Sequence, residues 1–280
     1  MFRLALLLIG LSSLPIETAT AQILPVRSRD YLFLTNVADV RALWVNPAGL
    51  AVVPEASLLG ELTFDRSSDD LRVEQYALGF NSRGFALGYQ RNRLVGEDPV
   101  GVLRTGFGYP IRSGALGAAV SRYSQDSTKS YGMEVGLVLF PRLKVPLQLG
   151  ALVRHIGRPT VRGGNLPVTG IGALQLSTAS LQISWESHAA ERVEPGVSGF
   201  DVTHRAGARV MFGGGGFPII LTGAVDLGSN VRIDQVNVGF SIGGARQVTA
   251  MGSVVQRDDN PVFERFSTTL VATNPIATRR

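Results

Sequence analysis

Apolar residues alternate with polar or small ones along most of the chain. In residues 181–186, for example, Leu181, Ile183 and Trp185 alternate with polar side chains. The same period of two recurs in residues 57–65, 131–139, 147–154 and 235–240. Such a period predicts strands with one apolar face and one polar or small face. About fourteen runs of this kind, each of about ten residues, lie between residues 57 and 273. The sequence therefore predicts an all-β chain.

The connections between these strands fall into two kinds that alternate along the chain. The short turns are 81–84, 110–114, 140–146, 177–180, 213–218 and 243–246. The longer, charged loops are 65–72, 91–99, 122–130, 155–167, 187–199, 226–232 and 257–261. This order requires about fourteen strands, with both ends of the sheet on the short-turn side. Short periplasmic turns, longer outer loops and an even strand count are typical of a transmembrane antiparallel β-barrel of the outer membrane.

Strand length and chain closure support the same architecture. A tilted strand of about ten residues crosses the hydrocarbon layer, and a closed barrel satisfies every backbone group in lipid. Closure requires the strand near residues 58–64 to pair antiparallel with the strand near residues 266–271. A secreted β-sandwich is the alternative, but its loops would have no reason to sort by length. The non-apolar face is rich in small and polar residues and predicts a narrow polar lumen. Its candidate lining residues are Glu61, Glu134, Gln148, Arg154, Glu186 and Arg209.

The N-terminal residues predict export. Met1, Phe2 and Arg3 precede an apolar run, and Ala19-Thr20-Ala21 follows as a small-x-small cleavage pattern, so residues 1–21 are expected to be a signal peptide. The expected organisation is therefore a signal peptide (1–21), a hatch or plug segment (22–56), a barrel (57–273) and a C-terminal tail (274–280). The expected location is the cell outer membrane, in contact with its lipid and lipopolysaccharide.

The amino-acid composition and motifs exclude several other classes of protein. The chain of 280 residues has no Cys, which excludes disulfides, thiolate zinc sites and cysteine nucleophiles. The net charge of +5 is scattered, whereas nucleic-acid binding needs cations gathered on one face. The G-x-S-x-G match at residues 239–243 lies in a strand, and every His precedes its Ser, so it does not predict a nucleophile elbow. We therefore expect no enzyme activity, no cofactor and no nucleic-acid partner.

Residues 30–54 form the most specific stretch of the sequence. Residues 37–45 predict one or two helical turns, which must end at Asn46 because a residue before proline is pushed out of the helical region. Gly49 is expected to permit an unusual turn. An amphipathic piece of this size cannot span a membrane. It can fold into the barrel mouth and bury Leu43 and Trp44.

The run Ala42-Leu43-Trp44-Val45-Asn46-Pro47-Ala48-Gly49-Leu50-Ala51 resembles the N-terminal NPA hatch motif of the long-chain fatty acid (FadL-type) outer-membrane transporters. It is equally similar to their relatives in the PorV/PorQ group associated with type IX secretion. The resemblance implies a fourteen-stranded barrel plugged by its N-terminal segment. It also implies a hatch or gating set formed by Leu43, Trp44, Asn46, Pro47, Ala48, Gly49 and Leu50.

Two functions follow from this resemblance. The first is a hatch-gated channel for small hydrophobic or amphipathic compounds, with a hydrophobic small molecule as its ligand. The second is a PorV-like structural or docking component for protein secretion or surface attachment, with a secretion-system or surface protein as its partner. No loop is long or apolar enough to form the helical outer loops of the fatty acid channels, so the resemblance does not extend to fatty acid uptake. The sequence favours transport.

Closure of the barrel would also bring two acidic loops together. Asp69 and Asp70 lie in the first loop, and Asp258 and Asp259 lie in the last. Carboxylate oxygens suit calcium, which makes these four the candidate metal ligands. Arginines in the same loops favour the simpler interpretation, in which the carboxylates are solvated rim charges and no metal is bound.

Overall fold

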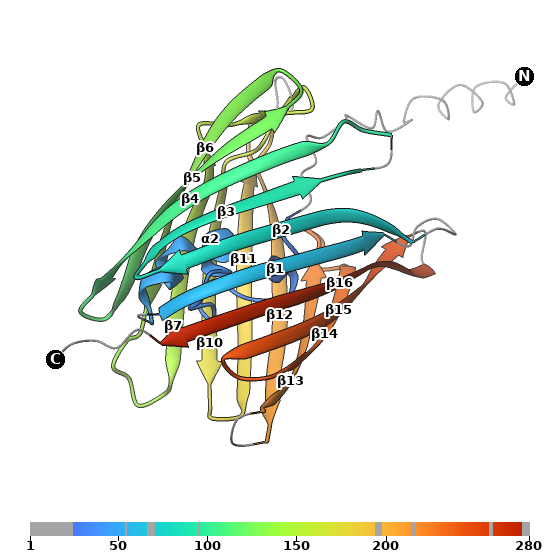
Figure 1. Ribbon diagram of the computed structural model, residues 1–280. Coiled ribbons are helices and arrows are strands. Elements are labelled where there is room, and N and C mark those ends of the chain that lie inside the picture. Colours follow the sequence, from blue (N-terminus) through green and yellow to red (C-terminus); the bar gives the residue numbers. More distant parts are fainter. Residues whose placement is uncertain are drawn as a thin grey trace, which may run out of the picture.

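Fourteen antiparallel strands close into one barrel (Figure 1). The computed structural model describes residues 25–53, 55–65, 71–94, 96–193, 198–213, 217–257 and 260–275. The barrel strands are β1 (Glu55–Asp65), β2 (Arg72–Ser82), β3 (Phe85–Asn92), β4 (Val100–Ile111), β5 (Gly114–Gln125), β6 (Thr128–Leu139), β7 (Leu147–Ile156), β10 (Thr169–Ser177), β11 (Leu181–Glu191), β12 (Phe200–Phe212), β13 (Ile219–Leu227), β14 (Ile233–Ile242), β15 (Arg246–Arg257) and β16 (Asn260–Pro275). Two short strands, β8 (Thr160–Val161) and β9 (Gly164–Asn165), form a separate hairpin between β7 and β10. The predicted signal peptide and the carboxylates Asp69, Asp70, Asp258 and Asp259 lie outside the described residues.

The first and last strands close the barrel, which confirms the predicted topology. β1 pairs antiparallel with β16, and the register places Leu59 opposite Val271 and Phe64 opposite Phe266. The two phenylalanine rings stack with their centroids 6.4 Å apart. With β1 paired to both β2 and β16, every barrel strand has two neighbours and the sheet has no free edge. A sheet without a free edge is the β arrangement that lipid tolerates.

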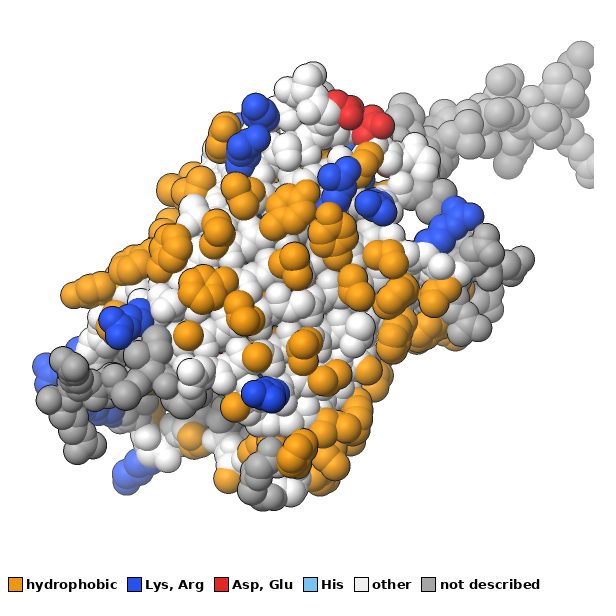
Figure 2. Space-filling model, in the orientation of Figure 1, with side chains coloured by type: hydrophobic (Ala, Val, Ile, Leu, Met, Phe, Trp, Pro, Cys, Tyr) orange, Lys and Arg blue, Asp and Glu red, His pale blue; other side chains and the backbone are white. Residues whose placement is uncertain are grey.

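The strand pleat sorts side chains between lipid and lumen. Along β1, Leu58 is 57% exposed, whereas its neighbour Leu59 is 3% exposed and faces inward. Glu61 follows Leu59 on the inward face and is buried, and Leu78 of β2 points outward beside β1. Figure 2 shows hydrophobic side chains spread over the outer wall between the two ends of the barrel. This exterior matches hydrocarbon, and the interior is polar, as the alternation predicts.

Loop lengths differ from the prediction. The connection between β5 and β6 is the two-residue turn 126–127, although it lies at the end of the barrel that was expected to carry longer loops. The connection between β6 and β7, at the opposite end, spans 140–146. The prediction of longer loops at one end without exception is therefore wrong, because several strands extend beyond the hydrophobic run that marks them. We call the end with turns 83–84 and 112–113 the short-turn end, and the other the long-loop end.

The residues before β1 form short helices. They are α1 (Ser28–Tyr31), α2 (Ala42–Val45) and the 3-10 helix η1 (Pro47–Ala51). Asn46 ends α2 in an extended conformation, as its position before proline predicts. Gly49 does not take a positive φ, so the predicted unusual turn is wrong. Glycine is required there for space, because a Cβ atom would overlap the carbonyl oxygen of Val37. Among the described residues, no helix is long and apolar enough to cross a membrane.

Candidate functional site

Residues 25–53, called the N-terminal segment from here on, lie inside the barrel. Leu43 and Leu50 are completely buried, and Trp44 is 2% exposed. α2 contacts β3 and β4, and η1 contacts β4, β5 and β6. Figure 1 shows these helices enclosed by the strands. Burying side chains of this size stabilises the packed segment by roughly 1.5–3 kcal/mol each, which offsets the cost of ordering a short chain.

The Asn46 side chain joins the N-terminal segment to the wall. Its amide nitrogen donates to the carbonyl oxygens of Leu34 (3.1 Å) and of Leu137 in β6 (3.2 Å). Its amide oxygen accepts from the backbone N–H of Ala48 (3.2 Å) and so caps η1. Among the hydrogen bonds that the structure describes, none joins the Asn46 amide to the lumen residues Glu61, Gln148 or Glu134. The turn between the helices brings backbone groups nearer to Asn46 than the wall carboxylates.

Two sets of glycines form the surface on which the N-terminal segment rests. Gly79 of β2 lies directly opposite Gly88 of β3, and a Cβ atom on either would overlap the ring of Trp44. Glycine at both positions therefore leaves a flat floor on which the indole lies. Five of the inward glycines that contact the segment in this way are called the glycine seat: Gly79, Gly88, Gly108, Gly117 and Gly136.

The second set runs across three strands beneath η1. Gly108, Gly117 and Gly136 are consecutive cross-strand partners on β4, β5 and β6. A Cβ atom at Gly117 would overlap Pro47, and one at Gly136 would overlap the Asn46 amide oxygen. The glycine seat was missed at the sequence level. Glycine at inward positions of neighbouring strands is the signal that could have revealed it.

The glycine seat makes a matched substitution pair possible. Gly88→Ala places a methyl group within the Trp44 ring, whereas Gly172→Ala in β10 meets open space. We expect Gly88→Ala to destabilise the packed segment by about 1–3 kcal/mol, the usual cost of overpacking. We expect Gly172→Ala to change stability by no more than about 0.5 kcal/mol. Thermal unfolding and Trp44 emission, measured in a Trp185→Phe background, test the difference. Equal unfolding temperatures and equal Trp44 emission in the two variants would contradict the packing of Trp44 on the glycine seat.

A buried ion cluster lies beside α2. The Arg104 guanidinium is 2.7 Å from a Glu134 carboxylate oxygen, and the Arg154 guanidinium is 3.2 Å from the same oxygen. The three side chains are at most 5% exposed. One carboxylate thus holds two arginines from different strands. Removing a buried carboxylate of this kind leaves the positive charges of its partners without a counter-charge.

The two arginines bind the C-terminal end of α2. Arg104 donates to the carbonyl oxygen of Leu43 (3.1 Å), and Arg154 donates to the carbonyl oxygens of Trp44 (3.3 Å) and Val45 (3.2 Å). The last carbonyl groups of a helix have no partner within the helix, and cations there are favourable. The wall therefore satisfies the free end of α2 from the side.

Wall carboxylates hold the earlier part of the segment. Glu61 accepts hydrogen bonds from the backbone N–H groups of Arg27 (2.6 Å) and Ser28 (3.2 Å) and from the Ser28 hydroxyl (2.7 Å). Glu186 accepts from the backbone N–H of Leu34 (2.6 Å). Of the predicted lumen residues, Glu61, Arg154 and Glu186 thus contact the N-terminal segment directly. Glu134 acts through the two arginines that it holds.

The other two predicted lumen residues are more peripheral. Gln148 accepts from Gln175 (3.4 Å), which in turn accepts from the Thr35 hydroxyl (2.9 Å). Arg209 lies on the same face of β12 as Arg205, opposite Gln182 of β11. Neither Gln148 nor Arg209 has a hydrogen bond to the N-terminal segment among those the structure describes.

Arg205 of β12 was missed at the sequence level. Its guanidinium lies 4.8 Å from the centre of the Phe33 ring, and its Nε is 3.3 Å from an Asp226 carboxylate oxygen. It also donates to the carbonyl oxygen of Arg29. Asn237 donates to Asp226 (3.0 Å) and extends this network to β14. An arginine at an inward position of an apolar strand is the signal that could have identified it.

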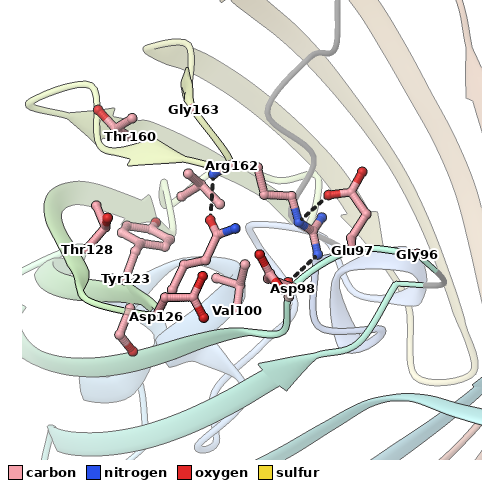
Figure 3. Close-up of a pocket in the computed structure, with 13 residues that line it drawn as sticks. Gly96, Glu97, Asp98, Val100, Tyr123, Asp126, Thr128, Thr160, Arg162 and Gly163 are labelled. Atoms are coloured by element: carbon pink, nitrogen blue, oxygen red, sulfur yellow. Dashed lines mark hydrogen bonds and ion pairs between the residues drawn. The ribbon is translucent and has the colours of Figure 1, made fainter.

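A polar pocket opens at the long-loop end (Figure 3). It has a volume of about 450 Å³ and lies between the loop before β4, the turn after β5 and the β8–β9 hairpin. Arg162 of the hairpin donates its backbone N–H to Gln125 (2.8 Å), and its guanidinium lies 2.9 Å from Glu97. Val100 and Tyr123 contribute buried apolar surface. The pocket, called the outer pocket below, combines charged walls with a small apolar floor.

Comparison with known proteins shows likeness in fold only. No protein-family model and no curated protein sequence matches the chain. Among solved structures, the chain is similar to the CymD monoaromatic hydrocarbon channel, with a TM-score of 0.64, 10% identity, and coverage of 91% of this chain and 98% of that one. It is also similar to the toluene transporter TbuX of Ralstonia pickettii, with a TM-score of 0.59, 12% identity, and coverage of 92% and 99%. A deltaS2S3 mutant of the TodX monoaromatic hydrocarbon channel gives a TM-score of 0.56 at 10% identity, with coverage of 90% and 99%. The likeness lies in the fold, a closed antiparallel β-barrel.

Proposed function

We propose that the chain is an outer-membrane channel for small hydrophobic or amphipathic compounds, and that the N-terminal segment is its gate. The observation that carries the proposal is the N-terminal segment packed inside a closed barrel by side-chain contacts. The barrel strands pair with one another in a complete ring. Displacing the segment would therefore break no hydrogen bond of the strand ladders. A part that can leave without opening the wall is suited to gating.

The strength of the contacts fits a movable part. Each hydrogen bond between the N-terminal segment and the wall contributes about 0.5–1.5 kcal/mol net, and bonds to charged groups contribute about 1.5–3 kcal/mol. Several of these together hold the segment firmly, yet each can be exchanged for water or ligand. The gating set in this proposal is Leu43, Trp44, Asn46, Pro47, Ala48, Gly49 and Leu50, all of them buried.

The substrate class rests on two observations. The lumen is lined by polar groups such as Glu61, Arg104 and Glu134, and the outer pocket has charged walls. A narrow path suits a small compound rather than a long alkyl chain, and its polar groups would also accommodate an amphipathic one. The names of the similar structures, hydrocarbon channels and a toluene transporter, support a small aromatic compound. The FadL-type part of the sequence resemblance agrees with these neighbours.

Uptake of a labelled small aromatic compound tests this function. Cells that lack other such channels should take up labelled toluene faster when they express this chain, and uptake of a labelled long-chain fatty acid should not change.

The gate itself is tested by a double substitution. Asn46→Ala combined with Pro47→Ala should give brief intermittent ion openings in planar bilayers, because the turn that seats η1 is weakened. Unchanged toluene uptake, together with a protein partner retained through mild-detergent purification, would instead favour the secretion or surface-attachment function.

A further inference from the structure

Among the residues that the structure describes, the short-turn end of the barrel carries exposed positive charge and no exposed negative charge. Four exposed cations lie in its turns and a fifth is the first residue of β15, and together they are called the basic rim: Arg83, Arg112, Arg142, Lys144 and Arg246. No exposed carboxylate lies at this end in the part of the chain that the structure describes. Glu55, at the start of β1, is half-buried beside Asp39 and Arg41. In Figure 2 the lower end shows Lys and Arg, and the visible acidic groups lie at the upper end.

The long-loop end differs in charge balance. Its exposed carboxylates, within the described ranges, are Glu97, Asp98, Asp126, Asp201 and Asp234. Exposed cations of similar number accompany them, and Arg192 pairs with Asp201 at 2.8 Å. Charges at this end therefore largely compensate one another, whereas those of the basic rim do not. The asymmetry is a property of one end and not of the whole basic chain.

The basic rim lies at the depth of lipid headgroups. Its turns directly follow or precede exposed apolar strand ends, where Phe85 is 49% exposed and Tyr109 is 61% exposed. Leu143, within the β6–β7 turn itself, is 59% exposed. Aromatic and apolar side chains at this level mark the boundary between hydrocarbon and headgroups. Long cationic side chains next to such a boundary reach the headgroup layer with their charged ends.

The cations follow the perimeter of the wall. They occupy the β14–β15 turn or its edge, then the β2–β3, β4–β5 and β6–β7 turns, which lie along one continuous arc of the strand order. The described residues of the β10–β11 and β12–β13 turns carry no charge. An arc that borders the apolar wall fits a layer of lipid around the barrel. A soluble acidic partner would more readily bind a compact patch of cations on the end face of the barrel.

We propose that the basic rim binds the phosphate groups of anionic phospholipids in the leaflet that meets the short-turn end. Arginine and lysine close to an anionic membrane surface each strengthen binding by about fivefold at moderate ionic strength. Several cations on one arc therefore select anionic over zwitterionic phospholipid. This lipid site is independent of the gate, since no residue of the basic rim contacts the N-terminal segment through a hydrogen bond or ion pair that the structure describes.

Lipid retention tests the site. The intact chain, purified in mild detergent with equal amounts of phosphatidylglycerol and phosphatidylcholine, is analysed for retained lipid by mass spectrometry. The rim variant replaces five cations: Arg83→Gln, Arg112→Gln, Arg142→Gln, Lys144→Gln and Arg246→Gln. The control variant removes the same number and kinds of charge from the long-loop end: Arg93→Gln, Lys129→Gln, Arg158→Gln, Arg192→Gln and Arg232→Gln.

The native chain and the control variant should retain phosphatidylglycerol at least about fivefold over phosphatidylcholine, and high salt should remove the preference. The rim variant should show no preference. The single substitutions Arg112→Gln and Lys144→Gln should each lower the preference for phosphatidylglycerol by a smaller step. They keep the test valid if the rim variant, with its five substitutions, fails to fold. A native chain without preference, or a rim variant that keeps it, overturns the site. Rim-dependent retention on immobilised polyglutamate without any lipid preference also overturns it, in favour of a soluble acidic partner.

Discussion

Deletion of residues 22–54 should convert a barrel with little steady ion conductance into an open pore. The deletion removes α1, α2 and η1 from the lumen and leaves β1 paired with β2 and β16. Barrels of about eight strands are filled by their own side chains, whereas those of about sixteen leave an aqueous channel. With fourteen strands and glycine at the five positions of the glycine seat, the emptied lumen should admit water and ions.

Planar-bilayer recordings measure this change, and the shift in gel mobility on heating checks that the shortened barrel is folded. The Gly172→Ala variant, altered only on the outer wall, serves as the control and should conduct as little as the intact chain. A deletion variant that folds and inserts, yet conducts no better than the intact chain, would show that the N-terminal segment is not a gate. The docking function would then be the better explanation of the barrel.

Glu134→Gln should release α2 from the wall. The substitution removes the carboxylate that both Arg104 and Arg154 contact, and it leaves two buried guanidinium groups without their counter-charge. Breaking a buried ion pair by removing one partner costs about 3–5 kcal/mol. The strand ladders are unaffected, so the loss should fall on the packing of α2 rather than on the barrel. The ion conductance of the Glu134→Gln barrel should rise as α2 leaves its packed position.

Iodide quenching of Trp44 reports this release. The chain has two tryptophans, so Trp185→Phe leaves Trp44 as the single emitter. Trp44 should be protected in that background and accessible after Glu134→Gln. Glu191→Gln is the matched control, because Glu191 pairs with Arg158 at an exposed position and such pairs contribute at most about 1 kcal/mol. Protection of Trp44 in both variants would contradict the role assigned to Glu134.

Much of the barrel could be predicted from alternation alone. A period of two fixes which side chains face lipid, and lipid does not tolerate a free strand edge, so fourteen runs imply pairing of the first strand with the last. Loop lengths could not be predicted in the same way. The strand pair β5–β6 continues through polar residues such as Ser124 and Lys129 beyond its hydrophobic run, and these pair across the ladder. Backbone pairing outside the membrane needs no apolar pattern.

The lumen was predictable only in part. The inward positions of Glu61, Glu134, Arg154 and Glu186 follow from strand parity, but their partners do not. Those partners are backbone groups of the N-terminal segment, whose path depends on where its short helices end. α1 was missed because four residues carry no helical period. The end of α2 at Asn46 was predictable because proline restricts the residue before it.

A reversible covalent lock tests most directly whether the N-terminal segment must move for the lumen to open. A Cβ atom at Gly150 of β7 would lie 3.0 Å from Cβ of Leu34, so a displacement of less than about 1 Å brings the pair to the separation of about 3.8 Å found in disulfides. The chain has no cysteine, so Leu34→Cys with Gly150→Cys creates a single thiol pair. Introduced together with Glu134→Gln, the pair should give low conductance when oxidised and the raised conductance of Glu134→Gln after reduction in the same bilayer. Equal conductance before and after reduction would contradict the gate.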